Sequence, residues 1–156
     1  MNENPKTILR DDASSPKSLP LRIALWLVRG ALAASFLSAV ADRFGYWGAP
    51  GDAGVVWGSV ANYEAYVGTL NWFLPPTWIG PLGWAATIAE VVVAVGLLVG
   101  WKLPAFALGA ALLLTTFAGT MLVALGPKPP LDYSVFTAVG AAFLLYAVTS
   151  ERRVVV

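Results

Sequence analysis

Four apolar runs, separated by polar or turn-forming stretches, divide the chain. Few charged residues interrupt them, and the first three have about the ~20 residues that an α-helix needs to cross the hydrocarbon core of a bilayer. The fourth is of marginal length for a span. We therefore predict a polytopic all-α membrane protein, a bundle of four transmembrane helices that cover residues 21–41, 79–101, 104–125 and 133–149.

The segments that flank these runs define the predicted domain limits. Residues 1–20 are polar and rich in Pro, Ser and charge, so they are too poor in apolar side chains to bury a core. We predict a disordered cytoplasmic tail there, a single membrane domain over residues 21–150, and a short cytoplasmic tail over residues 151–156.

A cleaved signal peptide is an alternative interpretation of the first run. The run ends in Ala-Val-Ala before Asp42, which resembles the small-residue site of a signal peptidase. Against this, Arg29 interrupts the apolar stretch, and the run is long enough to span. We favour a retained helix because the later runs also require a membrane.

Residues 42–77 form the longest predicted connection and are dense in aromatic residues. Apolar side chains recur in it at intervals of three and four, which predicts a short amphipathic helix lying on the membrane surface. The aromatic residues form either a headgroup belt or a lid over a site, and the sequence leaves both open. The predicted apolar face consists of Val56, Val60, Tyr63, Val67 and Leu70.

Composition supports the membrane class. Of the 156 residues, 58% are hydrophobic and 12% are charged, whereas about 25% are charged in ordinary soluble domains. The formal net charge of +1 gives no reason to expect a nucleic-acid partner. The chain has no Cys and no His, which excludes disulfides, thiol relays and the usual zinc and haem ligands. We predict no metal site, and any redox chemistry must use a bound cofactor or a partner.

Basic residues gather on one side of the predicted membrane. Under the positive-inside rule this places both termini in the cytoplasm and the aromatic connection on the outer face. Arg43 and Lys128 are the basic residues on the outer side. The residues on the cytoplasmic side are Lys6, Arg10, Lys17, Arg22, Lys102, Arg152 and Arg153.

Arg29 and Glu90 are charged residues inside predicted spans. On insertion scales a charge at the centre of a helix costs about 2.5–3.5 kcal/mol, so each should face protein or water. At a rise of ~1.5 Å per residue, Arg29 lies about 12 Å and Glu90 about 17 Å from the cytoplasmic ends of their helices. We predict that the two side chains pair. The alternatives are that Arg29 extends to the headgroups and that Glu90 is protonated and packed.

Three stretches carry a resemblance to a known family: LVRGALAASFLSAVADRFGYWG, AEVVVAVGLLVG and PAFALGAALLLTTFAGTM. Over residues 21–149 the chain resembles DoxX-like membrane proteins. The resemblance implies a four-helix protein of a bacterial-type inner membrane, related to the membrane subunit DoxD of thiosulfate:quinone oxidoreductases. It also implies that Arg29 and Glu90 match the charged sites of that family, and that Asp42 with Arg43 match its exit from the first helix. The absence of Cys and His departs from DsbB-like quinone reductases.

Three functions compete at this stage. The first is a quinone-facing or anchoring subunit of a membrane oxidoreductase complex, with Arg29 and Glu90 as candidate catalytic residues. Trp84 and Thr87, on the same predicted helix as Glu90, would complete a quinone site. The second is a non-catalytic scaffold of a membrane assembly, and the third is a carrier of an apolar or weakly acidic solute. All three require the lipid bilayer, and the first two require further subunits.

Overall fold

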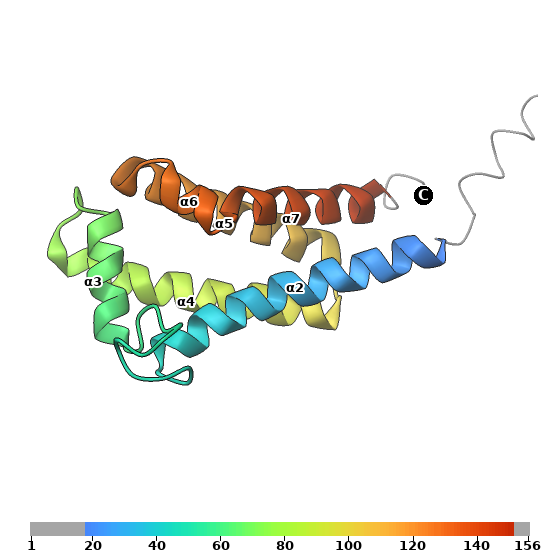
Figure 1. Ribbon diagram of the computed structural model, residues 1–156. Helices are drawn as coiled ribbons and strands as arrows, with labels where there is room; N and C mark the ends of the chain where they lie inside the picture. The colour runs from blue at the N-terminus through green and yellow to red at the C-terminus, as the bar shows by residue number, and fades with distance from the viewer. Residues whose placement is uncertain (1–17, 152–156) are drawn as a thin grey trace, which may run out of the picture.

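The computed structural model describes residues 18–151, and within that part every regular element is a helix. Figure 1 shows a bundle of long helices with two short helices at one end. The predicted tails lie outside the described residues, apart from their innermost positions. The helices are α2 (Leu19–Arg43), α3 (Val60–Leu70), α4 (Pro76–Val99), α5 (Leu103–Leu125), α6 (Lys128–Asp132) and α7 (Val135–Ser150).

The long helices pack as two pairs. α2 packs against α4, α5 packs against α7, and α4 and α5 join the pairs. The shared core is built largely from alanines with Phe36, Leu97 and Leu145, all buried. Small side chains of this kind let helix backbones approach closely, which is how helices associate within lipid.

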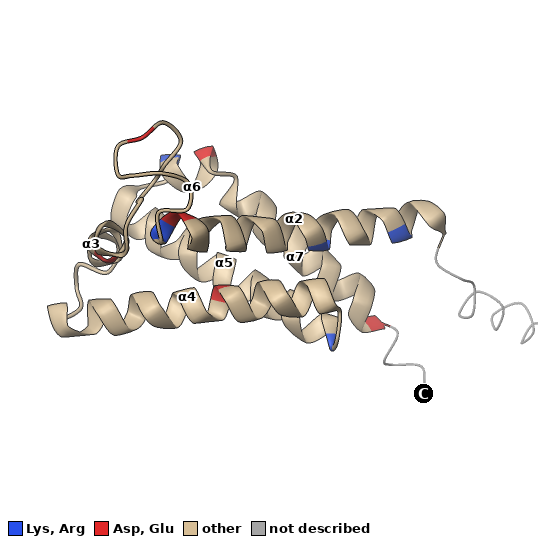
Figure 2. Ribbon diagram, turned by 90° about the horizontal axis from the view of Figure 1, so that it is seen from below, with Lys and Arg blue, Asp and Glu red and all other residues tan. Residues whose placement is uncertain are grey.

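Three helices are long and apolar enough to cross a membrane: α2, α4 and α5. Figure 2 shows that charged residues gather mainly toward the ends of the bundle. These features confirm a helical membrane protein. α7 has 16 residues, or about 24 Å at ~1.5 Å per residue, so the predicted number of four spans is not confirmed.

The two ends of the bundle differ. One end, here called the loop end, carries the connection over residues 44–59 together with α3 and α6; the other, the turn end, carries the tight turn between α4 and α5 (Figure 1). α2 begins and α7 finishes at the turn end. The predicted short helix in the first connection is confirmed as α3, which buries Tyr63 and Val67. Val56, predicted on the same face, precedes this helix and is exposed.

Arg29 satisfies the carbonyl groups at the C-terminus of α4. Its Nε donates to the Leu97 carbonyl at 2.8 Å and its Nη2 to the Leu98 carbonyl at 3.0 Å. These carbonyls belong to the last turn of a helix, which lacks intrahelical donors and carries partial negative charge. Gly100 ends α4 in a left-handed conformation (φ 79°), and a Cβ there would lie 2.6 Å from Nη2 of Arg29.

We expect Gly100→Ala to lower the free energy of unfolding by about 1–2 kcal/mol, because alanine is strained in the left-handed region. The added methyl group also displaces Arg29, so the loss should be smaller in an Arg29→Met background. Thermal unfolding in mild detergent measures both effects. Gly119→Ala is the control, because a Cβ there meets nothing within 4 Å and the helix position favours alanine. Equal effects at the two glycines would contradict this interpretation.

Candidate functional site

A buried ion pair joins the last residue of α2 to the middle of α4. The Arg43 Nη2 donates to Glu90 Oε1 at 2.7 Å, and the two residues are 3% and 0% exposed. The Nη1 of Arg43 donates to the Thr87 hydroxyl at 2.7 Å, and this hydroxyl donates to the Gly83 carbonyl at 2.8 Å. A buried ion pair is tolerated only where further hydrogen bonds satisfy its remaining groups. Thr87, one helical turn before Glu90, supplies one of them.

Aromatic rings cover the guanidinium of Arg43. Its Cζ lies 3.9 Å from the ring centroid of Tyr63 and 5.3 Å from that of Trp57. Trp57 in turn contacts Tyr63 edge-on at 5.2 Å and Tyr66 at 5.8 Å, between ring centroids. The faces of these rings carry partial negative charge, so they stabilise a cation that has been removed from water. α3 therefore closes over the ion pair.

Asp42 holds the loop that brings Trp57 to this position. Its Oδ2 accepts hydrogen bonds from the backbone N–H groups of Val56 at 3.1 Å and Trp57 at 2.9 Å. The Trp47 indole N–H donates to the Ser38 carbonyl at 3.1 Å, which ties the same loop to α2 a second time. Adjacent residues of one helix end thus have separate tasks: Asp42 orders the loop and Arg43 binds α4.

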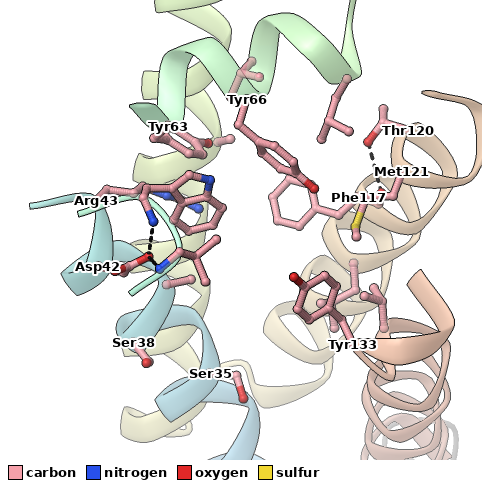
Figure 3. A pocket seen from close by; sticks show the side chains of 18 of the residues that line it. Ser35, Ser38, Asp42, Arg43, Tyr63, Tyr66, Phe117, Thr120, Met121 and Tyr133 are labelled. Carbon is pink, nitrogen blue, oxygen red and sulfur yellow. Dashed lines mark hydrogen bonds between the residues drawn. The ribbon is translucent and has the colours of Figure 1, made fainter. Parts of the chain in front are cut away.

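Beside these residues lies a cavity of about 530 Å³. Its walls come from α2, α3, α4, α5, the loop and the start of α7, and they are mainly apolar (Figure 3). The phenols of Tyr66 and Tyr133 point into it from opposite sides. Burial raises the pKa of the Tyr66 phenol, and the neighbouring Tyr133 raises it further, so Tyr66 is a neutral hydrogen-bond donor at physiological pH. Ligand sites typically combine an apolar cavity of this size with a few polar groups.

Polar atoms of three cavity-lining residues are buried without a hydrogen-bond partner among the described residues. They are Nε of Arg43, Nε1 of Trp57 and Oδ1 of Asp42. The first two are donors, and the third is an acceptor. A buried polar group without a partner costs about 1–3 kcal/mol. The two donors and the acceptor thus belong to residues of the cavity wall and have unused hydrogen-bonding capacity.

The predicted pair between Arg29 and Glu90 is wrong. Glu90 pairs with Arg43, and Arg29 binds the carbonyls at the turn end of α4. The predicted pairing requires the ends of α2 and α4 at the turn end to lie level. Figure 1 shows instead that α2 extends beyond the end of α4, which brings Arg29 level with the last turn of α4 rather than with its middle.

The structure separates the four residues predicted to bind a quinone. None of Arg29, Glu90, Trp84 and Thr87 lines the large cavity. Trp84 and Thr87 line a second cavity of about 10 Å³, which Arg43 also lines. Glu90 is fully buried and bound to Arg43. Thr87 and Glu90 both accept hydrogen bonds from Arg43, whereas Arg29 binds the C-terminus of α4. The proposed catalytic roles of Arg29 and Glu90 stay predictions.

The predicted quinone site contains none of the residues that form the cavity wall. Asp42 and Arg43 end an apolar run, and Arg43 was interpreted as a flanking charge of the outer side. The signal that could have identified them is an acid and a base together at the end of a span, followed by an aromatic connection with no other basic residue. Trp57 and Tyr66 belong to the aromatic connection predicted as either a headgroup belt or a lid over a site, and Tyr133 begins the predicted fourth span.

We expect Arg43 and Glu90 to be energetically coupled. Arg43→Met or Glu90→Leu alone should each cost about 3–5 kcal/mol, because the remaining charge is left buried, and the double variant should cost much less than the sum. Unfolding in mild detergent gives the three values. Arg29→Met with Glu90→Leu is the control pair, which should be additive within about 0.5 kcal/mol. Additivity for Arg43 and Glu90 would mean that the pair does not exist in solution.

In a comparison with protein families, residues 21–132 match the family described as methylamine utilisation protein MauE. No curated protein and no solved structure matches the chain. The resemblance to DoxX-like proteins is therefore wrong as a family assignment. It depended on charges in successive apolar helices and on small-residue runs, which compact membrane bundles share for physical reasons. The matched residues include the ion pair, the loop and most of the cavity wall. On this evidence the chain belongs to the MauE family of methylamine utilisation proteins.

Proposed function

We propose that this protein is a quinone-binding membrane subunit of a methylamine utilisation system, and that the large cavity holds the quinone ring. The family match over residues 21–132 supports a role in such a system. The choice of a quinone as ligand rests on two N–H donors without acceptors, Nε of Arg43 and Nε1 of Trp57. Both belong to residues in the wall of an apolar cavity. A carbonyl oxygen on an apolar ring meets both requirements.

The charges around the cavity favour a neutral ligand over an anion. One cation, Arg43, is buried beside two acids, Asp42 and Glu90. If all three are ionised, this group has a net negative charge, which opposes a carboxylate ligand in a medium of low dielectric. The charge balance therefore supports a quinone above the weakly acidic solute considered as an alternative.

The same wall suits both redox forms of a quinone. A quinone carries two electrons and two protons when it is reduced. Arg43 and Trp57 orient a carbonyl oxygen by donating hydrogen bonds, and Oδ1 of Asp42 accepts a hydrogen bond from a hydroxyl group. Glu90 fixes the guanidinium of Arg43 and does not line the cavity. The electrons must come from a partner oxidoreductase subunit, because the residues of this chain offer no thiol couple.

The proposal includes an orientation in a bacterial-type plasma membrane. α7 serves as the fourth span, both termini are cytoplasmic, and the loop end faces outward. The basic flanks support this orientation. The start of α2 and the finish of α7 at one end of the bundle fit an even number of spans (Figure 1).

Single cysteines test the orientation without any background, because the chain has none of its own. A charged maleimide added to intact cells should modify Ala53→Cys, in the exposed loop, and leave Glu151→Cys unmodified until the cells are permeabilised. Mass spectrometry of the purified variants measures both. The reverse pattern would invert the orientation, and modification of both in intact cells would exclude an even number of spans.

Trp57→Phe tests the ligand, because it keeps an aromatic ring and removes the N–H donor. We expect it to weaken binding of a short-chain benzoquinone about 2- to 10-fold, as for one lost hydrogen bond of about 0.5–1.5 kcal/mol. Titration calorimetry of the purified protein in nanodiscs measures the affinity. Trp84→Phe is the matched control, because Trp84 does not line the large cavity, and its affinity should equal that of the native chain.

Two outcomes would overturn the proposal. One is that the native chain fails to bind the benzoquinone at concentrations that saturate other quinone sites. The other is that Trp57→Phe and Trp84→Phe have the same affinity as the native chain. In either case the scaffold function would be favoured, and the cavity would have another ligand.

A further inference from the structure

The loop over residues 44–59 and α3 cover the large cavity at the loop end. Asp42 binds the backbone of the loop at Val56 and Trp57, and the Trp47 indole binds the Ser38 carbonyl. α3 lies across the same end and places Tyr63 and Val67 in the cavity wall. The aqueous side of the cavity is therefore covered by a segment that is tied to α2 at two separate places.

Core and wall side chains lie at the turn end and the back of the cavity. Phe36 of α2 and Leu145 of α7 belong to the buried core, which continues from the cavity toward the turn end. Leu82 and Ala86 of α4 and Phe117 of α5 form further wall. Figure 1 shows α2 and α7 converging toward the turn end and separating toward the loop end.

The remaining side lies between α2 and the start of α7. Ser35 and Ser38 line the cavity from α2 and are exposed, and Tyr133 lines it from the opposite side and is 67% exposed. Figure 3 shows Ser35 and Ser38 on one side of this gap and Tyr133 on the other. The Ser35 hydroxyl donates to the Ala31 carbonyl at 2.9 Å, so this edge presents a satisfied polar group to lipid.

We propose that the cavity opens sideways into the lipid, through the gap between Ser35 and Ser38 of α2 and Tyr133 before α7. The site then binds molecules that are dissolved in the membrane. The ring of such a molecule lies in the cavity, and its apolar tail lies in the gap. The quinone ring as ligand rests on the function proposed above. The lateral opening rests on the loop tied over the loop end and on the exposed Ser35, Ser38 and Tyr133 that line the cavity.

The small side chains of α2 are suited to this opening. A large apolar residue at position 35 or 38 would fill the gap and seal the cavity, as the bulky core residues do nearer the turn end. The apolar wall formed by Phe117 and Met121 continues from the gap to the polar groups of Arg43 and Trp57. A molecule with a long apolar tail and a hydrogen-bonding ring matches this sequence of surfaces.

A cysteine inside the cavity tests the opening without relying on any quinone. Leu114 lines the cavity and is half-buried, so Leu114→Cys places the chain's single thiol there. In nanodiscs we expect N-dodecylmaleimide, which partitions into lipid, to modify this thiol at least 10-fold faster than a charged maleimide does, with each rate divided by that of the same reagent on Ala53→Cys. Adding Ser35→Trp should slow modification by the dodecyl reagent at least 10-fold.

Ala34→Trp is the matched control, because Ala34 is exposed on the same helix and does not line the cavity. It should leave the rate unchanged. The inference is overturned if the charged reagent is as fast as the dodecyl reagent, if Ser35→Trp leaves the rate unchanged, or if neither reagent modifies Leu114→Cys while Ala53→Cys reacts. Loss of benzoquinone binding with intact lateral labelling would instead refute the proposed function and keep the opening.

Discussion

The loop end of this protein depends on the ion pair between Arg43 and Glu90. Both side chains are buried, and each would be strongly unfavourable in the membrane without the other. The pair connects α2 to α4, and Thr87 and the rings of Tyr63 and Trp57 complete the surroundings of the guanidinium. Both Nη atoms of Arg43 bind side chains of α4, whereas its Nε is buried without a partner among the described residues.

The loop over residues 44–59 follows from the residue next to Arg43. Asp42 binds two successive backbone N–H groups of that loop, which brings Trp57 against Arg43 and holds the loop over the cavity. The same short sequence therefore sets the helix contact, the loop conformation and the polar groups of the site. An apolar cavity with these few polar groups is the arrangement on which the proposed binding of a membrane-dissolved quinone depends.

Much of the architecture could be predicted because lipid imposes simple requirements on sequence. Apolar runs of spanning length gave the long helices, and the periodicity of Val60, Tyr63 and Val67 gave α3. The candidate site was predicted less well. Glu90 was recognised as needing a partner, but Arg29 was chosen because the helix ends were assumed to lie level. The family resemblance failed for a related reason, since intramembrane charges and small residues are general needs of a bundle.

The sequence by itself determined that this is a helical membrane protein, that it has no thiol or histidine chemistry, and that an acid lies in the middle of its central apolar helix. These properties depend on composition and on periodicity along one chain segment. Only the tertiary structure decided that Arg43 is the partner of Glu90, that Arg29 completes the end of α4, and that Asp42, Trp57 and Tyr133 border one cavity. Such choices depend on the axial offset between helices and on the path of a loop, and both are set by packing between segments far apart in the chain.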